Sequence, residues 1–365
     1  MQFKEFVDLC HSKNIKVILD AVFNHCSSDF HAFNDVRENG ENSRYCNWFH
    51  INSFPLSPLP DLNYECFEFI SDMPKFNVCN DETSRYLRDV AAFWIENYGI
   101  DGWRFDVADE VDRKFWIKLR NDLKEKASNT VTIGEAWEEA SSWLNNDIFD
   151  SATNYPVTWF IYDLFIYGCL NVEQFKHKVE EHLMKFNLIC TKNLMNVVDT
   201  HDTQRFLTTC GNDSRKFALG IVFQFTFPGI PMIYYGDEIG MSGGGDPDCR
   251  KPMVWDSKKW NKEILDTYKF LIALRKNTPV LIDGEYRNLK TSGDKEILAY
   301  KRDNLKECII VVMNAADKHS QATVNINRIA KSVKGLNSDE VFDTDNGEFR
   351  VNLAPFEWRI YEANP

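Results

Sequence analysis

Short apolar segments of strand length, each preceded by a helical segment and ended by a charged residue, recur along the chain. Residues 15–20 follow an amphipathic stretch at 1–14 and end in Asp20, and residues 99–106 end in Asp106. Uninterrupted, β-branched strands of this kind are typical of parallel sheets that are buried on both faces. The repeat therefore predicts a parallel α/β fold.

Four further segments extend the repeat to six strands: 131–135, 148–150, 194–198 and 231–235. Glu135 ends one of them, and His201 and Asp202 lie just past the end of another. A charged side chain at the end of a buried strand must point into a cleft or be neutralised. Because the active site of a (β/α)₈ barrel lies at the carboxyl ends of its strands, we expect an incomplete TIM barrel with about six of its eight strands.

The sequence changes in character near Asp283. Three later segments of strand length are apolar or alternating: 296–302, 307–313 and 349–361. An Asn-Gly pair at 346–347 marks a turn before the last of them. We therefore expect a partial barrel over residues 1–283, a loop-rich insertion within it at 26–80, and a C-terminal antiparallel β-sandwich domain at 284–365.

The net charge of −13, from 42 Lys and Arg against 55 Asp and Glu, disfavours nucleic acid as a partner, because an acidic protein repels phosphates. The sequence shows no leader peptide and no apolar run of about 20 residues, which argues against a membrane partner. Its ten Cys are irregularly spaced, which favours reduced thiols over disulfides or a zinc site. We expect a cytoplasmic protein without cofactor or metal. Asp246 and Asp248 could ligate calcium, but a loop contact is the favoured interpretation.

Asp106 and Glu135 have the chemistry that retaining hydrolysis of a glycosidic bond requires. That reaction uses one carboxylate as nucleophile and a second carboxyl group, about 5–5.5 Å away, as general acid and base. Arg104 precedes Asp106 by two residues, on the same face of the strand, and would keep that carboxylate ionised. An alanine and a tryptophan follow Glu135, an apolar setting that favours a protonated acid. Asp202 is a third carboxylate that could stabilise positive charge on the sugar.

Four motifs occur in a fixed order along the chain. They are Asp-Ala-Val-Phe-Asn-His at 20–25, Gly-Trp-Arg-Phe-Asp-Val-Ala-Asp-Glu at 102–110, Gly-Glu-Ala-Trp at 134–137 and Thr-His-Asp-Thr at 200–203. Together they resemble the signature regions of glycoside hydrolase family 13, the α-amylase family.

The resemblance implies Asp106 as nucleophile, Glu135 as general acid and base and Asp202 as transition-state carboxylate. It also implies that the sugar at the cleavage subsite is contacted by His25, Arg104 and His201. Two further residues, Asp20 and Asn24, are implied to support this wall of the site.

Two further segments resemble the cyclomaltodextrinase, neopullulanase and maltogenic amylase group. The second motif ends in Asp109-Glu110, where that group has Asn-Glu and strict α-amylases have Lys-His. Met-Pro-Lys-Phe-Asn at 73–77 resembles the group's fifth motif, although Leu-Pro-Asp-Leu-Asn at 59–63 is similar to that of oligo-1,6-glucosidases. We favour the first because Asn77 leaves room for one helix and one strand before the nucleophile. Asn77, Glu110 and Trp137 are thus further candidates for substrate contact.

The resemblance implies hydrolysis of α-1,4-glucosidic bonds in maltooligosaccharides, cyclodextrins or pullulan, with transglycosylation as a side activity. Departures at Ala136, Glu138 and Asp199, where the family pattern differs, leave the preferred linkage open. The alternatives are an oligo-1,6-glucosidase-type α-glucosidase and a catalytically inactive truncated fragment. A non-catalytic binding subunit would be expected to have lost its catalytic carboxylates, which are present here.

The first motif lies on the third barrel strand in the family, yet its strand here begins at Ile15. From this we expect a barrel that lacks two strands, and a missing N-terminal β domain of the kind that the group often uses for dimerisation. The full-length enzyme would then be a dimer, while the oligomeric state of the present chain stays open. Exposed strand edges would make the chain prone to aggregation and weakly active or inactive alone.

Overall fold

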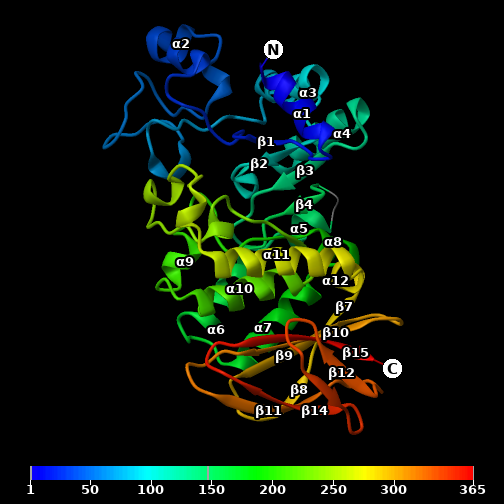
Figure 1. Cartoon of the computed structure of the whole chain (residues 1–365). Coiled ribbons are helices and arrows are strands. Elements are labelled where there is room, and N and C mark those ends of the chain that lie inside the picture. Colours follow the sequence, from blue (N-terminus) through cyan, green and yellow to red (C-terminus); the bar gives the residue numbers. More distant parts are fainter. Residues whose placement is uncertain (1, 146–147, 365) are drawn as a thin grey trace. The chain divides into compact units, whose positions relative to one another are not determined.

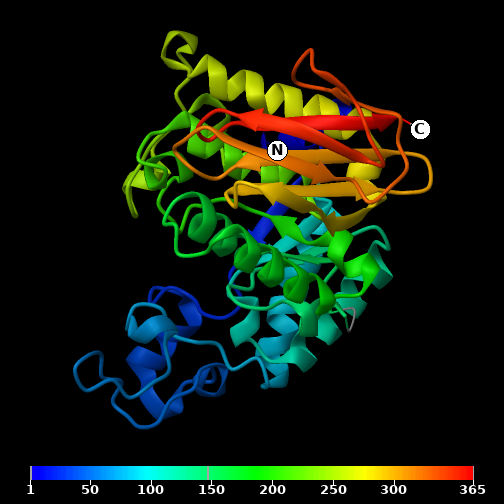
Figure 2. The same cartoon turned by 90° about the horizontal axis from the view of Figure 1, so that it is seen from below.

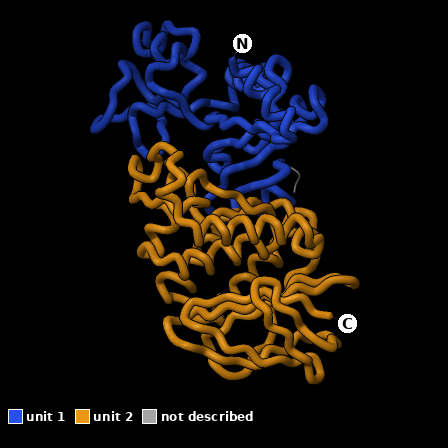
Figure 3. The backbone as a smooth tube through the Cα atoms, in the orientation of Figure 1, with its two compact units in different colours: residues 1–153 blue, residues 154–365 orange. Residues whose placement is uncertain are grey.

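The computed structural model describes residues 2–145 and 148–364; Met1 of the first expected helix lies outside them. The chain forms two compact units, residues 1–153 and 154–365 (Figure 3). Of the helices in the described residues, none is both long and apolar enough to cross a bilayer.

A parallel sheet with helices packed on it forms the centre of the first unit (Figure 1). Its four strands lie in chain order across the sheet: β1 (Ile18–Ala21), β2 (Gly102–Phe105), β3 (Val131–Gly134) and β4 (Ser151–Ala152). The helices of this unit are α1 (Gln2–Ser12), α2 (His31–Asn39), α3 (Asp81–Tyr98), α4 (Arg113–Lys126) and α5 (Ser141–Leu144). The expected strand at 148–150 is therefore misplaced, because pairing with β3 begins only at Ser151.

Local signals in the sequence set the helix ends that deliver the chain to β2 and β3. The side chain of Asn80 accepts the N–H groups of Glu82 and Thr83 at the start of α3, and Gly99 ends this helix with a left-handed backbone at φ 71°. Asp112 caps α4 in the same way. Each helix thus stops a few residues before the next buried strand, as in a repeating α/β unit.

The insertion at 26–80 contains α2 and otherwise short 3₁₀ turns and isolated bridges. Aromatic side chains form its core, with Phe33 packed edge-on against Phe49 and Tyr64. Phe49 also stacks on Phe76, at a ring-centroid distance of 5.7 Å. The loop-rich segment is thereby ordered by side-chain packing rather than by regular secondary structure.

The second unit begins with a helical layer around a short parallel strand pair, β5 (Met195–Asn196) and β6 (Ile230–Pro231). Strand β5 confirms the expected strand at 194–198 in shorter form, whereas β6 shares only Pro231 with the expected strand at 231–235 and begins one residue earlier. With β1–β4 they make six parallel strands in the part of the chain that the structure describes. The helices are α6 (Tyr155–Phe165), α7 (Val172–Met184), α8 (Leu188–Asn193), α9 (Phe206–Thr209), α10 (Ser214–Thr226), α11 (Lys262–Asn277) and α12 (Val280–Asp283).

Two antiparallel sheets follow in the same unit (Figure 2). The first has the order β13 (Val341–Asp343), β12 (Ser332–Gly335), β15 (Trp358–Asn364), β10 (Cys308–Asn314), β9 (Ile297–Asp303) and β7 (Glu285–Asn288). The second has the order β14 (Glu348–Leu353), β11 (Ser320–Asn325) and β8 (Lys290–Gly293).

Both faces of the larger sheet are buried. Successive side chains of each strand point alternately to the two faces and so join two different cores. In β10, Ile309 and Val311 join the core formed with the helices α6, α7, α10 and α11. Ile310 and Val312 join a second core, shared with the smaller sheet. This arrangement is the expected C-terminal β-sandwich.

Strand β1 lies at the edge of its sheet, with β2 as its neighbour. Its apolar side chains are unusually exposed for a parallel strand, since Ile18 is 39% and Val22, just past its end, is 44% accessible. Parallel strands are normally covered on both sides, so this edge is an apolar surface open to further contacts.

Candidate active site

The register of β1, β2 and β3 gathers three carboxylates around the guanidinium of Arg104. Asp20 pairs with Arg104 directly across the parallel sheet. Ile133 pairs with it on the other side, so Glu135, two residues further along, points to the same face. Asp106 reaches that face as well, because it lies two residues beyond Arg104. Strand pairing alone therefore explains why these groups meet.

The contacts within this cluster are short and direct. Arg104 donates through Nη1 to both carboxylate oxygens of Asp20, at 2.9 and 3.0 Å, and to Oδ1 of Asp106 at 2.8 Å. Its Nη2 lies 2.5 Å from Oε1 of Glu135. Burial disfavours the charged guanidinium, but the three carboxylates outweigh it and hold the pKa of Arg104 above its ordinary value. The expected pairing of Arg104 with Asp106 is confirmed.

Glu135 is buried, being 1% exposed, but its carboxyl group is not in the apolar setting expected from the sequence. Besides the ion pair with Arg104, its Oε2 accepts the backbone N–H of Val107 at 3.0 Å. Val107 has a left-handed backbone with φ 44°, which is strained for a β-branched residue. Both contacts favour the ionised carboxylate, because cations and N–H donors stabilise negative charge.

Hydrogen bonds join the segments that follow β1 and β2 to the insertion, through Asn24, Glu110 and Lys75. The buried side chain of Asn24 donates to Oε2 of Glu110 at 3.3 Å, and Lys75 contacts the same oxygen at 3.3 Å. Lys75 belongs to the motif at 73–77 and was not among the predicted site residues. Asn77 of that motif donates from its side chain to the carbonyl of Asn47 at 3.1 Å, which anchors the segment.

His25 lies in this same region and is 9% exposed. Its ring stacks on Phe67, with ring centroids 4.7 Å apart and planes 11° apart. Burial lowers the pKa of His25, while the negative charges of Asp106 and Glu110 partly oppose this. A neutral imidazole held flat by an aromatic ring can donate or accept one hydrogen bond to a sugar hydroxyl.

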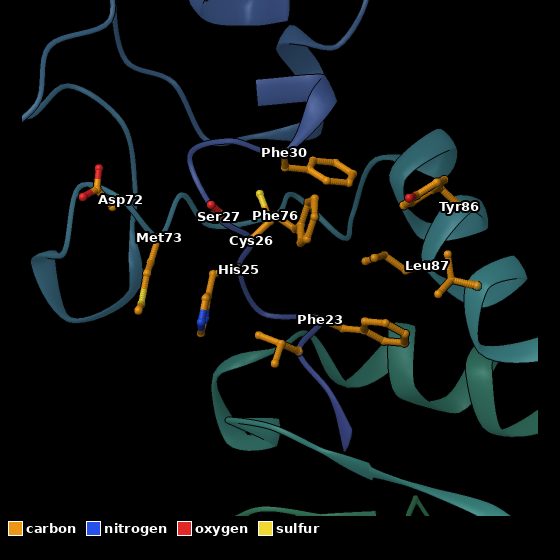
Figure 4. A pocket seen from close by; sticks show the side chains of 12 residues that line it. Phe23, His25, Cys26, Ser27, Phe30, Asp72, Met73, Phe76, Tyr86 and Leu87 are labelled. Carbon is orange, nitrogen blue, oxygen red and sulfur yellow. The ribbon is translucent and has the colours of Figure 1, made fainter. Parts of the chain in front are cut away.

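An apolar cavity of about 600 Å³ lies beside His25 (Figure 4). Four aromatic side chains contribute much of its lining: Phe23, Phe30, Phe76 and Tyr86. Neither Asp106 nor Glu135 lines it. The cavity therefore adjoins one predicted sugar contact without containing the predicted catalytic carboxylates.

Trp137 and Asp109 lie in the segments that follow β3 and β2. Trp137 is half-buried, as a sugar platform would be. Burial raises the pKa of Asp109, and hydrogen bonds from the N–H groups of Asp109 and Trp137 partly offset that rise. Asp109 thus links these two segments through the backbone of Trp137.

Asp202 belongs to the second unit, where two side chains, those of His201 and Arg250, contact its two oxygens. His201 Nε2 lies 3.1 Å from Oδ2, and Arg250 Nη2 lies 3.0 Å from Oδ1. Arg250 also donates through Nε to the carbonyl of His201 at 2.9 Å. Arg250 was not predicted as a site residue, although it follows closely on Asp246 and Asp248, which the sequence analysis considered.

The described residues contain no group of three or more His, Cys, Asp or Glu arranged to hold a metal ion. Asp246 instead pairs with Arg250 at 3.1 Å. Asp248 pairs with Lys251 at 2.7 Å and accepts the N–H of Gly244 at 2.7 Å. These are the loop contacts favoured from the sequence.

Two family models match nearly the whole chain. The model described as the alpha amylase catalytic domain matches residues 1–284, and the model described as the maltogenic amylase C-terminal domain matches residues 286–360. The chain belongs to the α-amylase family. This α-amylase family chain is 40% identical over 358 residues to a cyclomaltodextrinase from Geobacillus thermopakistaniensis, covering 98% of the chain and 61% of that relative.

Two further matches have similar extents. The chain is 39% identical over 361 residues to neopullulanase 2 from Thermoactinomyces vulgaris, covering 98% of the chain and 61% of that protein. A solved structure of a cyclomaltodextrinase superimposes with a TM-score of 0.94 at 36% identity, covering 99% of the chain and 62% of the other. The chain thus spans about three fifths of the length of these members of the α-amylase family.

Proposed function

We propose that this protein hydrolyses α-1,4-glucosidic bonds with retention of anomeric configuration, acting on maltooligosaccharides, cyclodextrins or pullulan. The observation that carries the proposal is the cluster in which Arg104 holds Asp106 and Glu135 on one face of the sheet. Two carboxyl groups on one face are what a double displacement at a sugar carbon requires.

Asp106 is the nucleophile in this proposal. Its contact with Arg104 orients the carboxylate, so that an oxygen can attack when the anomeric carbon approaches. Attack by Asp106 forms a covalent glycosyl ester and releases the leaving sugar. Water then attacks the same carbon from the leaving-group side and restores the original configuration.

Glu135 acts as the general acid in the first step and as the general base in the second. In the substrate-free geometry, Arg104 and the Val107 N–H favour its ionised form, which suits the second step. For the first step, Glu135 must take up a proton. Insertion of a neutral sugar beside Arg104 would weaken the ion pair and favour the protonated acid.

Asp202 is proposed as the transition-state carboxylate, with His201 and Arg250 fixing its two oxygens. His25, Asn77, Glu110 and Trp137 are proposed as substrate contacts, on the resemblance of their motifs to those of the family. Asp20 supports this wall by binding Arg104, and Asn24 supports it by binding Glu110.

The substrate class is supported by relatives named cyclomaltodextrinase and neopullulanase. The segment at 59–63, which is similar to an oligo-1,6-glucosidase motif, forms hydrogen bonds within the insertion through Asn63. Asn63 donates to the carbonyls of Ser53 and Pro55 and accepts the N–H of Ser57. All ten Cys are free thiols, which supports a reducing, cytoplasmic location as part of the proposal.

Product analysis with β-cyclodextrin, pullulan, starch and isomaltose tests the proposal. The proposed function predicts linear maltooligosaccharides from β-cyclodextrin and no glucose from isomaltose. Release of glucose from isomaltose, with β-cyclodextrin untouched, would instead identify an α-1,6-specific enzyme. Turnover of none of the four substrates by folded protein would refute hydrolysis by this chain.

A further inference from the structure

A buried group of two carboxyls and one guanidinium closes the loop that carries Asp202. The loop runs from Asp199, just beyond β5, to Phe206, the first residue of α9. Asp199, Arg205 and Asp237 are each at most 1% exposed. Ionisable groups are rarely buried this deeply unless they are paired and hydrogen-bonded.

Both ends of the loop are held by this group. Asp199 Oδ2 accepts the backbone N–H of Phe206 at 2.6 Å, which ties the first residue of the loop to the last. Arg205, just before Phe206, donates to Oδ1 of Asp237 at 3.0 Å and to the carbonyl of Tyr235 at 2.7 Å. Asp237 lies in the 3₁₀ turn η5 (Asp237–Ile239), so the loop is also tied to the segment after β6.

The carboxyl groups of Asp199 and Asp237 lie close enough to share a hydrogen bond, which requires a proton on one of them because ionised carboxylates can only accept. Among the described residues, Asp199 Oδ1 and Asp237 Oδ2 are the oxygens of this pair that lack another donor. A proton on Asp237 Oδ2, donated to Asp199 Oδ1, satisfies both atoms. It leaves Asp199 Oδ2 for Phe206 and Asp237 Oδ1 for Arg205.

The charge balance points to the same arrangement. One carboxylate, one carboxylic acid and one guanidinium sum to zero, whereas two carboxylates with Arg205 would leave a net negative charge in the core. Two adjacent anions in a buried site repel strongly, and one of them takes up a proton. Burial raises the pKa of Asp237 well above its ordinary value, and the neighbouring Asp199 raises it further. Burial also raises the pKa of Asp199.

We propose that Asp199 and Asp237 share a single proton and that this proton holds the loop from Asp199 to Phe206 in the geometry that positions Asp202. Asp199 and Asp237 are positioning residues, because they act through the loop and not on the sugar. The proposal of a shared proton is independent of the proposed function. Only the effect of this proton on catalysis rests on the proposed function.

The surroundings of the pair contain few other charges. Arg205 is the cation in contact with it, and its guanidinium carbon lies 4.3 Å from the ring centroid of Tyr234. Among the described residues, the other titratable groups that interact with the pair or with Arg205 are Tyr162 of α6, Cys210 after α9, Tyr234, Tyr235 and Tyr268 of α11, and Glu238 of η5 interacts with Tyr268. The phenols and the thiol are neutral near neutral pH, so Arg205 supplies the charge that faces the pair directly.

The sign of the pH dependence follows from the raised pKa values. A carboxyl group whose pKa is higher in the folded than in the unfolded protein stabilises the fold fully below the unfolded value of about 4, and this stabilisation is lost as the pH rises through the folded value. Alkaline pH should therefore remove the shared proton and loosen the loop.

Infrared spectroscopy of the folded protein near neutral pH tests the proposal directly. We expect a carbonyl band of a protonated carboxylic acid in the wild type, and its loss in both Asp237→Asn and Asp199→Asn. Asparagine keeps a donor and an acceptor in place, so both variants should fold. Glu135→Gln is the matched control and should keep the band. An acid band that is absent from the wild type, or unchanged in both variants, would overturn the proposal.

Unfolding by urea at about pH 5 and about pH 9 gives a second readout that needs no activity. The wild type should lose stability between these pH values, and Asp237→Asn should lose less because its amide cannot titrate. Equal losses would contradict the shared proton.

An inactive protein with the expected band and pH dependence would refute the proposed function alone. If the chain is active, Asp237→Asn should retain more of its kcat at alkaline pH than the wild type, and an identical decline would refute the positioning role.

Discussion

Arg104 and Glu135 form a buried ion pair in which Nη2 lies 2.5 Å from Oε1. The same guanidinium donates to Oδ1 of Asp106 at 2.8 Å, so one cation binds both the proposed nucleophile and the proposed general acid. The positive charge of Arg104 therefore lies against both carboxyl groups in this structure. In the proposed mechanism, the sugar must separate Glu135, but not Asp106, from Arg104.

Replacing Asp106 with Asn should lower kcat/KM on every hydrolysable substrate by about 10³-fold or more, because the amide cannot attack the sugar. The volume and the contact with Arg104 are largely retained, so the urea midpoint should stay near that of the wild type. Substantial residual activity in a folded variant would rule out Asp106 as the nucleophile.

Replacing Glu135 with Gln should separate substrates by their leaving groups. Glucosyl fluoride needs no proton on its leaving group, whereas a maltooligosaccharide does. The first step of the variant should therefore be retained far better on the fluoride than on maltotriose, as measured by pre-steady-state fluoride release. Equal losses of this step on both substrates would contradict the acid role.

Replacing Arg250 with Gln should lower kcat by about tenfold with little change in KM, because Asp202 loses the cation at Oδ1. Lys251→Gln is a matched control, since Lys251 pairs with Asp248 instead. Steady-state kinetics of the two variants check this, and equal effects would show that Arg250 has no special role.

Replacing Asp150 with Asn should destabilise the protein by about 1–3 kcal/mol at neutral pH. Asp150 accepts the N–H of Thr132 at 2.9 Å and pairs with Arg120 and Lys124 at 2.8 and 3.0 Å. Burial alone would raise its pKa, but these donors outweigh burial and lower it.

The pH dependence of that variant has a definite sign. Because the folded pKa of Asp150 is lowered, its stabilisation is present above the unfolded value of about 4 and is lost as the pH falls through the folded value. Urea unfolding as a function of pH should show the wild type and Asp150→Asn converging in acid. A constant difference would contradict this role of the ionised carboxylate.

The sequence predicts the six parallel strands and the family because apolar periodicity and the four motifs are local signals. The contact of Arg104 with Asp106 is equally local, since the two residues are two apart on one strand. The pair of Arg104 with Glu135 depends on the register of β2 and β3, which no local pattern specifies. The apolar neighbours of Glu135 in the sequence therefore did not reveal its ion pair with Arg104.

Residues that act through distant partners were also missed. Asp199 stood out as a departure from the family pattern, but its partner Asp237 lies beyond two helices and a strand, α9, α10 and β6. Arg250 lies in a recognisable segment, yet only the folded loop brings it to Asp202. The strand at 148–150 was misplaced because Ile148 and Phe149 are buried without pairing to β3.

Trapping the covalent intermediate is the most direct test of the mechanism. Incubation with 5-fluoro-α-glucosyl fluoride, followed by proteolysis and mass spectrometry, should add one fluoroglucosyl group to the peptide that contains Asp106, and the label should be located on that residue. The same label on Glu135 or Asp202, or hydrolysis of α-glucosyl fluoride with inversion and without any labelled Asp106, would contradict the account.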